Sequence, residues 1–158
     1  MAKKDYIEQN KWLEYREALI KQTTINRSES FGEKKTRIKK LEENPEEWFQ
    51  YYFPNYCSAP SADFHKRSTR RIFKNMEWFE CRCWSRELAK STRTMMEVLY
   101  LILLGKKKNV ILVSNSEDNA KRLLEPFRAQ LDSNQRIIND YGAQRSAFKW
   151  TDAEFKTK

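Results

Sequence analysis

The chain is short of the residues that make tight turns. Its 158 residues include only three glycines and four prolines. An all-β sandwich or barrel needs such residues at its many turns, so the composition argues against one. Long apolar runs are also lacking. The longest, residues 98–104, spans seven positions, whereas a membrane-spanning helix needs about 20. The sequence therefore predicts neither a β-rich nor a membrane-spanning protein.

Cysteine and histidine are equally scarce. The three cysteines are Cys57, Cys81 and Cys83. His65 is the one histidine, and we interpret it as an ordinary satisfied polar residue. An odd cysteine count without a C-x-x-C pair predicts neither a disulfide framework nor a zinc site, and it favours buried free thiols in a reducing compartment. The first residues carry no secretory signal pattern, which predicts a cytoplasmic location.

Positive charge is in excess but is not concentrated in one part of the chain. Lys and Arg number 31 against 22 Asp and Glu, which gives +9 with His65 neutral. A highly charged solvated surface explains this excess as well as a nucleic-acid-binding face does. Residues 34–41 hold five basic residues, and an exposed charged helix is favoured there over a contact with DNA or a partner.

Periodicity predicts an alternation of helices and strands. The predicted helices are residues 5–22, a short helix after Asn44, and residues 64–78, 90–104 and 116–131, with residues 23–36 as a linker. Residues 79–84 and 109–114 have patterns typical of strands. Strand, helix, strand and helix at this spacing predict an α/β fold with a parallel sheet and right-handed crossovers.

Two of the predicted helices have faces that can be assigned. In the helix over 5–22, Tyr6, Leu13 and Ile20 fall at heptad spacing and mark the predicted buried stripe, with Trp12 and Leu19 flanking it. Residues 90–104 are almost apolar all round, which predicts a helix buried between layers and ended by Gly105.

The short helix after Asn44 has a marked start. Asn44 can cap it, Pro45 suits its first position, and Glu47 can complete a capping box. The aromatic residues at positions 48–53 are predicted to pack this helix onto the domain rather than to stack on nucleic-acid bases.

One segment carries a chemical pattern. Residues 84–92 read Trp-Ser-Arg-Glu-Leu-Ala-Lys-Ser-Thr and lie between a predicted strand and its helix. The phosphate-binding loop G-x-x-x-x-G-K-[ST] occupies the same kind of junction, and Lys90 and Ser91 match its last two positions. A helix start offers unpaired N–H groups and a positive dipole end to a phosphate. Lys90 adds a charge for the β and γ oxygens, and the Ser91 hydroxyl can ligate Mg²⁺.

Both glycines of that pattern are missing. Trp84 and Ala89 stand in their places. Ala89 is acceptable if its φ is negative, and Trp84 must point away from the nucleotide. The alternative interpretation is a polar helix start in which Ser91 and Thr92 act as caps.

Residues 85–92 resemble the deviant phosphate loop of phage large terminase subunits, which reads roughly S/P-R-x-x-G/A-K-S/T-T. Arg86 and Ala89 match that loop, whereas Glu87 departs from its usual neutral residue. The resemblance covers about residues 46–155. Its later segments are similar to the family's second strand and helix and to the segment that follows: residues 110–116, Asn119-Ala120, residues 131–142 and Lys149-Trp150.

The resemblance implies the ATPase domain of a DNA-packaging motor with P-loop NTPase (ASCE-type) topology, here with an incomplete parallel sheet. Residues 45–158 would be the front part of that domain, and residues 1–44 an N-terminal charged helical region. The implied ligands are ATP and Mg²⁺. The implied partners are double-stranded DNA, the portal protein and the small terminase subunit, in a ring when assembled, in the host cell cytoplasm.

The resemblance also implies roles for the loop residues. Lys90 would hold the β and γ phosphates, and Ser91, with Thr92 beside it, would help to place Mg²⁺. Arg86 would act catalytically near the γ-phosphate, as a sensor or a cis arginine finger. The residues implied to bind the nucleotide are Ser85, Arg86, Glu87, Leu88, Ala89, Lys90, Ser91 and Thr92.

The acidic second motif of such ATPases is not found in the sequence. It is an apolar strand that ends in Asp followed by Asp or Glu, whereas residues 110–113 are followed by Ser114. The carboxylates of the family's nuclease domain are not found either. We therefore expect the N-terminal part of a longer protein, which alone binds nucleotide weakly and does not hydrolyse it. The alternatives are a fragment of another P-loop motor or helicase-like ATPase, and a non-enzymatic binding module with no nucleotide site.

Overall fold

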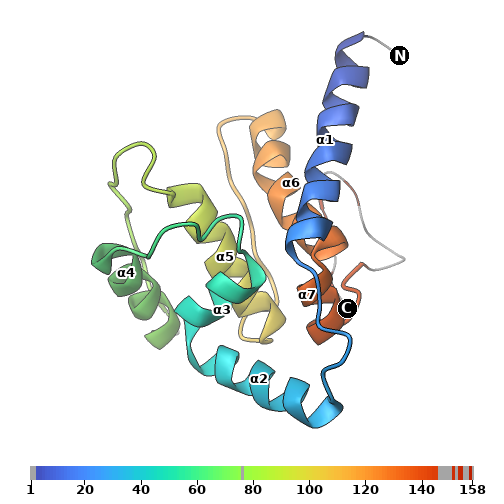
Figure 1. Cartoon of the computed structure of the whole chain (residues 1–158). Helices are drawn as coiled ribbons and strands as arrows, with labels where there is room; N and C mark the ends of the chain where they lie inside the picture. Colours follow the sequence, from blue (N-terminus) through green and yellow to red (C-terminus); the bar gives the residue numbers. More distant parts are fainter. Residues whose placement is uncertain (1–2, 76, 146–150, 152, 155–156, 158) are drawn as a thin grey trace. The chain divides into compact units, whose positions relative to one another are not determined.

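The described part of the chain is built from helices alone. The computed structural model describes residues 3–75, 77–145, 151, 153–154 and 157, and side chains from residue 12 onward. The predictions made for Lys149 and Trp150 lie outside these residues. The helices are α1 (Lys3–Gln22), α2 (Phe31–Glu43), α3 (Pro45–Tyr52), α4 (Asp63–Lys74), α5 (Lys90–Leu103), α6 (Glu117–Ser133) and α7 (Gln135–Tyr141) (Figure 1).

The predicted parallel sheet, and with it the α/β P-loop topology, is wrong. Residues 79–84 and 109–114 contain no strand and make no backbone ladder within the described residues. A β-branched or alternating run favours extended backbone, but a strand also needs a hydrogen-bonded neighbour. These segments have none, and their apolar side chains stay exposed: Phe79 by 91%, Ile111 by 85% and Val113 by 84%.

The chain divides into two units, one formed by residues 1–39 with 111–158 and the other by residues 40–110. In the first unit, α1 lies beside α6 (Figure 1). Arg16 Nε donates a 2.9 Å hydrogen bond to Ser133 Oγ, and the backbone N–H of Gln135 donates to Thr23 Oγ1 at 3.0 Å. These bonds fix the end of α1 against the junction of α6 and α7.

The predicted buried stripe of the first helix is wrong. Leu13 and Ile20 are exposed, whereas Leu19 at the flank of the stripe is buried. The prediction for Tyr6 falls outside the described side chains. The heptad spacing predicted the face next to the one that is actually buried. Leucine and aromatic residues occur on both faces of this helix, so the pattern alone does not decide between them. The same unit contains one confirmed helix start, where Ser116 Oγ accepts from the backbone N–H of Asn119. The helix then continues through Pro126 without a break.

The second unit has an aromatic core on α3. The predicted cap is confirmed: Asn44 Oδ1 accepts from the N–H of Glu46 at 3.2 Å, with Pro45 as the first helical residue. The predicted packing role of the aromatic residues is confirmed as well, since four of them have no exposed surface. Those four are Trp48, Phe49, Tyr52 and Phe53.

Helix α5 packs on this core. The prediction that it is almost apolar all round is wrong. The Tyr100 ring meets the Trp48 ring edge to face at 5.1 Å and stacks on Phe73 of α4 at 4.5 Å. Arg93 and Glu97 are also buried, four residues apart on one face. Gly105, with a φ of 68°, follows the helix end as predicted.

Helix α4 is shorter than the helix predicted over residues 64–78. It ends at Lys74, and the backbone N–H of Asn75 closes its last turn on the Arg71 carbonyl. Met76, which the predicted helix includes, lies outside the described residues. Among the described residues, none of the helices combines the length and the apolar composition that crossing a bilayer requires.

Candidate functional site

The predicted phosphate loop is an irregular turn at the start of α5. Residues 85–89 contain no regular secondary structure, and the helix begins at Lys90. Two residues of the turn adopt the left-handed conformation: Glu87 has a φ of 66° and Ala89 a φ of 52°. Such residues allow the chain to bend sharply before it enters the helix.

Ala89 occupies the position where the loop pattern has its second glycine. We expected alanine to be acceptable there with a negative φ, and that condition is not met, since its φ and ψ are 52° and 29°. A residue with a Cβ pays about 1 kcal/mol or more for this conformation, which glycine adopts freely. The backbone thus keeps the geometry that a glycine would favour, although the glycine is missing.

The Lys90 side chain folds back across the turn. Its Nζ donates a 2.6 Å hydrogen bond to the carbonyl oxygen of Trp84, at the other end of the segment. Lys90 is half-buried, and no carboxylate pairs with it in the described part of the chain. A carbonyl oxygen satisfies one N–H but leaves the positive charge uncompensated. The turn therefore holds a cation that can bind an anionic ligand.

The start of α5 leaves its backbone donors available. Ala89 is the N-cap residue and provides no side-chain cap. Within the described residues, the backbone N–H groups of Lys90, Ser91 and Thr92 have no hydrogen-bond acceptor. The alternative in which Ser91 and Thr92 cap this helix is therefore not what the structure shows. Uncapped N–H groups at a helix start are suited to an anion.

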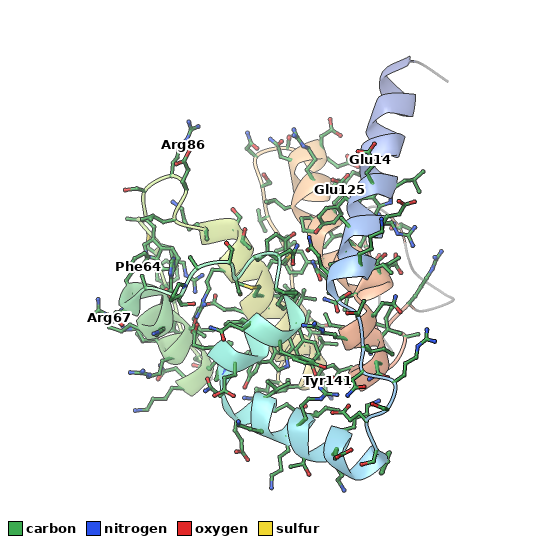
Figure 2. The ribbon with its side chains drawn as sticks, viewed as in Figure 1. Glu14, Phe64, Arg67, Arg86, Glu125 and Tyr141 are labelled. Atoms are coloured by element: carbon green, nitrogen blue, oxygen red, sulfur yellow. The ribbon has the colours of Figure 1, made fainter. Side chains whose placement is uncertain are left out.

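The other predicted loop residues lie at the surface. Ser85, Arg86, Glu87 and Leu88 are exposed. Figure 2 shows Arg86 projecting from the tip of the turn, and it makes no hydrogen bond or ion pair within the described residues. The structure thus brings Lys90 and Ser91 together at the helix start, but it gives Arg86 no contact with either.

The turn is held against α4 by an aromatic contact. The Trp84 ring lies 5.1 Å from the Phe64 ring and 5.0 Å from the His65 ring. His65 Nε2 also donates to the Leu88 carbonyl oxygen at 3.0 Å. We interpreted His65 from the sequence as an ordinary satisfied polar residue. It is satisfied, but by the loop itself, and no sequence signal connected these two segments.

The segment that leads into the turn is anchored by a partly buried network. Arg82 donates to Glu97 of α5 at 2.6 Å and to Glu80 at 3.0 Å. Ser68 of α4 and Trp78 also donate to Glu80. Burial acts to raise the pKa of Glu80, but these hydrogen bonds outweigh it and hold the pKa below 4.5. The sequence analysis did not find this network. One signal for it was present, because Arg93 and Glu97 are spaced by one helical turn and can therefore pair.

A cavity of about 470 Å³ adjoins the start of α5. Lys90, Ser91 and Arg82 contribute its cationic and hydroxyl groups, while Glu80 and Glu97 are already bound to Arg82. The remaining lining residues are Ile72, Trp78, Thr94, Val98 and Leu101.

The residues present fit Mg²⁺ only in part. Among the described residues, no group of three or more metal-binding side chains lies together. Mg²⁺ usually keeps several waters and takes oxygens from substrate phosphates, so the chain needs to supply few ligands. The exposed Ser91 hydroxyl is one such oxygen, and it can contribute only together with a phosphate.

The prediction of buried thiols is wrong for two of the three cysteines. Cys81 and Cys83 are exposed, and Cys57 is half-buried. The Sγ atoms of Cys81 and Cys83 lie 3.6 Å apart, because alternate residues of this extended segment share a side. The hydrogen bond between the two thiols raises the pKa of Cys81.

Comparisons with known proteins do not identify the chain. No protein-family model matches its sequence, and no similar curated protein or solved structure was found.

Proposed function

We propose that the turn over residues 85–92 binds the phosphates of Mg-ATP at the start of α5. The observation that carries the proposal is the Lys90 ammonium, bound by the Trp84 carbonyl at 2.6 Å and without a carboxylate partner. It stands beside the uncapped N–H groups of the first helical turn. Cation and donors at one helix start form an arrangement suited to phosphate oxygens.

In this proposal the loop residues keep the roles that the terminase resemblance implies. Lys90 binds the β and γ phosphates, Ser91 contributes an oxygen to Mg²⁺, and Arg86 acts near the γ-phosphate. Because Arg86 is exposed and makes no contact, it has to move toward the ligand. The protein would then be the N-terminal ATPase portion of a motor that translocates double-stranded DNA, with a portal protein and a small terminase subunit as partners.

Calorimetric titration of the 158-residue chain with Mg-ATP tests the proposal. We expect weak binding that Lys90→Ala reduces about tenfold or more, because a charge-assisted hydrogen bond contributes about 1.5–3 kcal/mol. Lys108→Ala is the matched control, since Lys108 is exposed and lies beyond the other end of α5. Equal affinity for wild type and Lys90→Ala would contradict the proposal.

A second candidate is a binding module with no nucleotide site. The observation that favours it is the fold, because no strand precedes the turn within the described residues, whereas a phosphate-binding loop normally follows one. This candidate predicts no heat of binding with millimolar Mg-ATP and no effect of Lys90→Ala. The titration above therefore distinguishes the two.

A further inference from the structure

Helix α4 carries a positively charged face. Its 12 residues include five lysines and arginines and one acid, Asp63 at its first position. At 100° per residue, the five basic residues fall within an arc of about 140° and extend over about 12 Å of the helix axis. All five are exposed. They are Lys66, Arg67, Arg70, Arg71 and Lys74.

The opposite face of α4 packs against the rest of its unit. Ser68 and Thr69 are buried and bond to Glu80 and to the Arg93 guanidinium. Phe73 stacks on Tyr100, and Phe64 packs on Trp84. The orientation of the helix is therefore fixed, and the basic face is the one left to solvent. Figure 2 shows Arg67 projecting outward from α4.

These cations form no close ion pair within the described residues, although Lys66 lies near enough to Glu46 to help lower its pKa. None of the five forms an ion pair or a side-chain hydrogen bond there. Three nearby carboxylates bind other arginines instead, since Glu80 and Glu97 bind Arg82 and Glu46 binds Arg93. The face therefore remains positively charged and open to an external anion.

A regular polyanion fits this face better than a single small anion. Duplex DNA carries one negative charge per about 1.7 Å of its axis, so 12 Å of helix can meet several phosphates at once. Three of the five cations are arginines, which bind phosphate oxygens in pairs. A single-stranded ligand would call for aromatic side chains on which bases stack, and the aromatic residues of α4 face inward.

We propose that the exposed face of α4 binds the phosphate backbone of duplex DNA. The choice of duplex DNA rests on the proposed function, but the binding itself uses no residue of the nucleotide site. The face would position the duplex without reading its sequence, because phosphate contacts carry no base information.

Fluorescence anisotropy with the 158-residue chain and a labelled duplex, without nucleotide, tests this proposal. Arg67→Ala/Arg71→Ala removes two charges from α4, and Lys35→Ala/Lys39→Ala removes two exposed charges from α2 as the matched control. We expect the α4 variant to weaken binding about tenfold or more and to reduce the slope of log K against log salt by about 2. The control should stay within about threefold of wild type.

Three results would overturn the proposal. Equal losses of affinity in both variants would indicate that net charge alone drives binding. Tighter binding of a single strand than of the duplex, or binding of polyglutamate without binding of the duplex, would indicate a different ligand, in the second case an acidic protein. Circular dichroism of both variants verifies that they fold. The Mg-ATP titration is independent of this assay. If Lys90→Ala fails to change nucleotide affinity while the α4 variant loses DNA, the nucleotide site is wrong and the DNA face stands.

Discussion

Helices α2 and α4 have the same number of basic residues but use them differently. Each contains five lysines and arginines. On α2, Arg37 binds Asp140 and Glu29, and Lys34 donates to the Asn139 carbonyl at 2.6 Å. On α4, no basic side chain forms a close ion pair or a side-chain hydrogen bond within the described residues. Arg37 and Lys34 of α2 therefore contribute to the fold, while the positive charge on α4 is available to a ligand.

This difference between the two helices arises from the positions of the acidic residues around them. Helix α2 contains Glu33, Glu42 and Glu43 and reaches a buried aspartate, Asp140. Helix α4 contains one acid, and Glu46, Glu80 and Glu97 of its own unit are bound to Arg82 and Arg93 instead. A basic cluster thus indicates a binding surface only if its side chains lack acidic partners within the protein. The following predictions test this rule, beginning with the largest effect.

The largest effect is expected where an arginine is fully buried. Arg93 is 3% exposed and binds Glu46, Thr69 and Ser61. Arg93→Ala leaves these groups without their donor, so we expect a loss of about 3–5 kcal/mol in the free energy of unfolding. Urea denaturation measures it. The matched control is Arg70→Ala on α4, which should change stability by no more than about 0.5 kcal/mol; equal effects would break the comparison.

A somewhat smaller loss is expected for the arginine of α2. The Asp140 side chain is fully buried, and Arg37 binds both of its oxygens at 2.7 and 3.0 Å. Arg37→Ala leaves Asp140 the neutral amide of Asn139 at 2.9 Å and the Lys34 ammonium at 3.9 Å, and we expect a loss of about 3 kcal/mol. Lys35→Ala, on the same helix but exposed, is the control. If the two variants unfold at the same urea concentration, the cations of α2 do not support the fold.

Stability should fall in acid because of the carboxylates that neutralise the buried arginines. Burial acts to raise the pKa of Glu46, but hydrogen bonds from Arg93 and Ser61 outweigh it and lower the pKa below 4.5. A lowered pKa stabilises the fold above about pH 4.5, and this contribution is lost as the pH falls through the folded-state value. Unfolding free energies at pH 6 and pH 3 should differ less in Glu46→Gln than in wild type. Glu77→Gln, at an exposed acid, should leave the difference unchanged.

The smallest effect on stability is expected for glycine substitutions at the residues that precede α4 and α5. Ala62 precedes α4 with a φ of −68°, whereas Ala89 precedes α5 with a φ of 52°. Ala89→Gly removes the left-handed strain and should stabilise the protein by up to about 1 kcal/mol. Ala62→Gly adds backbone freedom to the unfolded chain and should destabilise it by about 0.5–1 kcal/mol. Thermal unfolding measures both, and the same sign for the two would show that Ala89 is not strained.

Local features could be predicted from the sequence, whereas pairing over distance could not. The cap at Asn44 and the packing of the aromatic residues after it depend on neighbours within a few positions, and both are confirmed. The strands over 79–84 and 109–114 depend on a partner that no local pattern supplies, and they are absent from the described residues. The link between His65 and Leu88 spans two segments and had no signal. The basic face of α4, by contrast, is visible in helical periodicity alone.

The central claim is that the start of α5 binds the phosphates of a nucleotide. The most direct test is to follow the backbone amide resonances of the isotope-labelled chain by NMR during titration with Mg-ATP. The account predicts that the amides of Lys90, Ser91 and Thr92 shift most and saturate, and that Lys90→Ala reduces these shifts at equal ligand concentration. Shifts confined to α4, or no shifts in residues 85–92 at millimolar Mg-ATP, would contradict it.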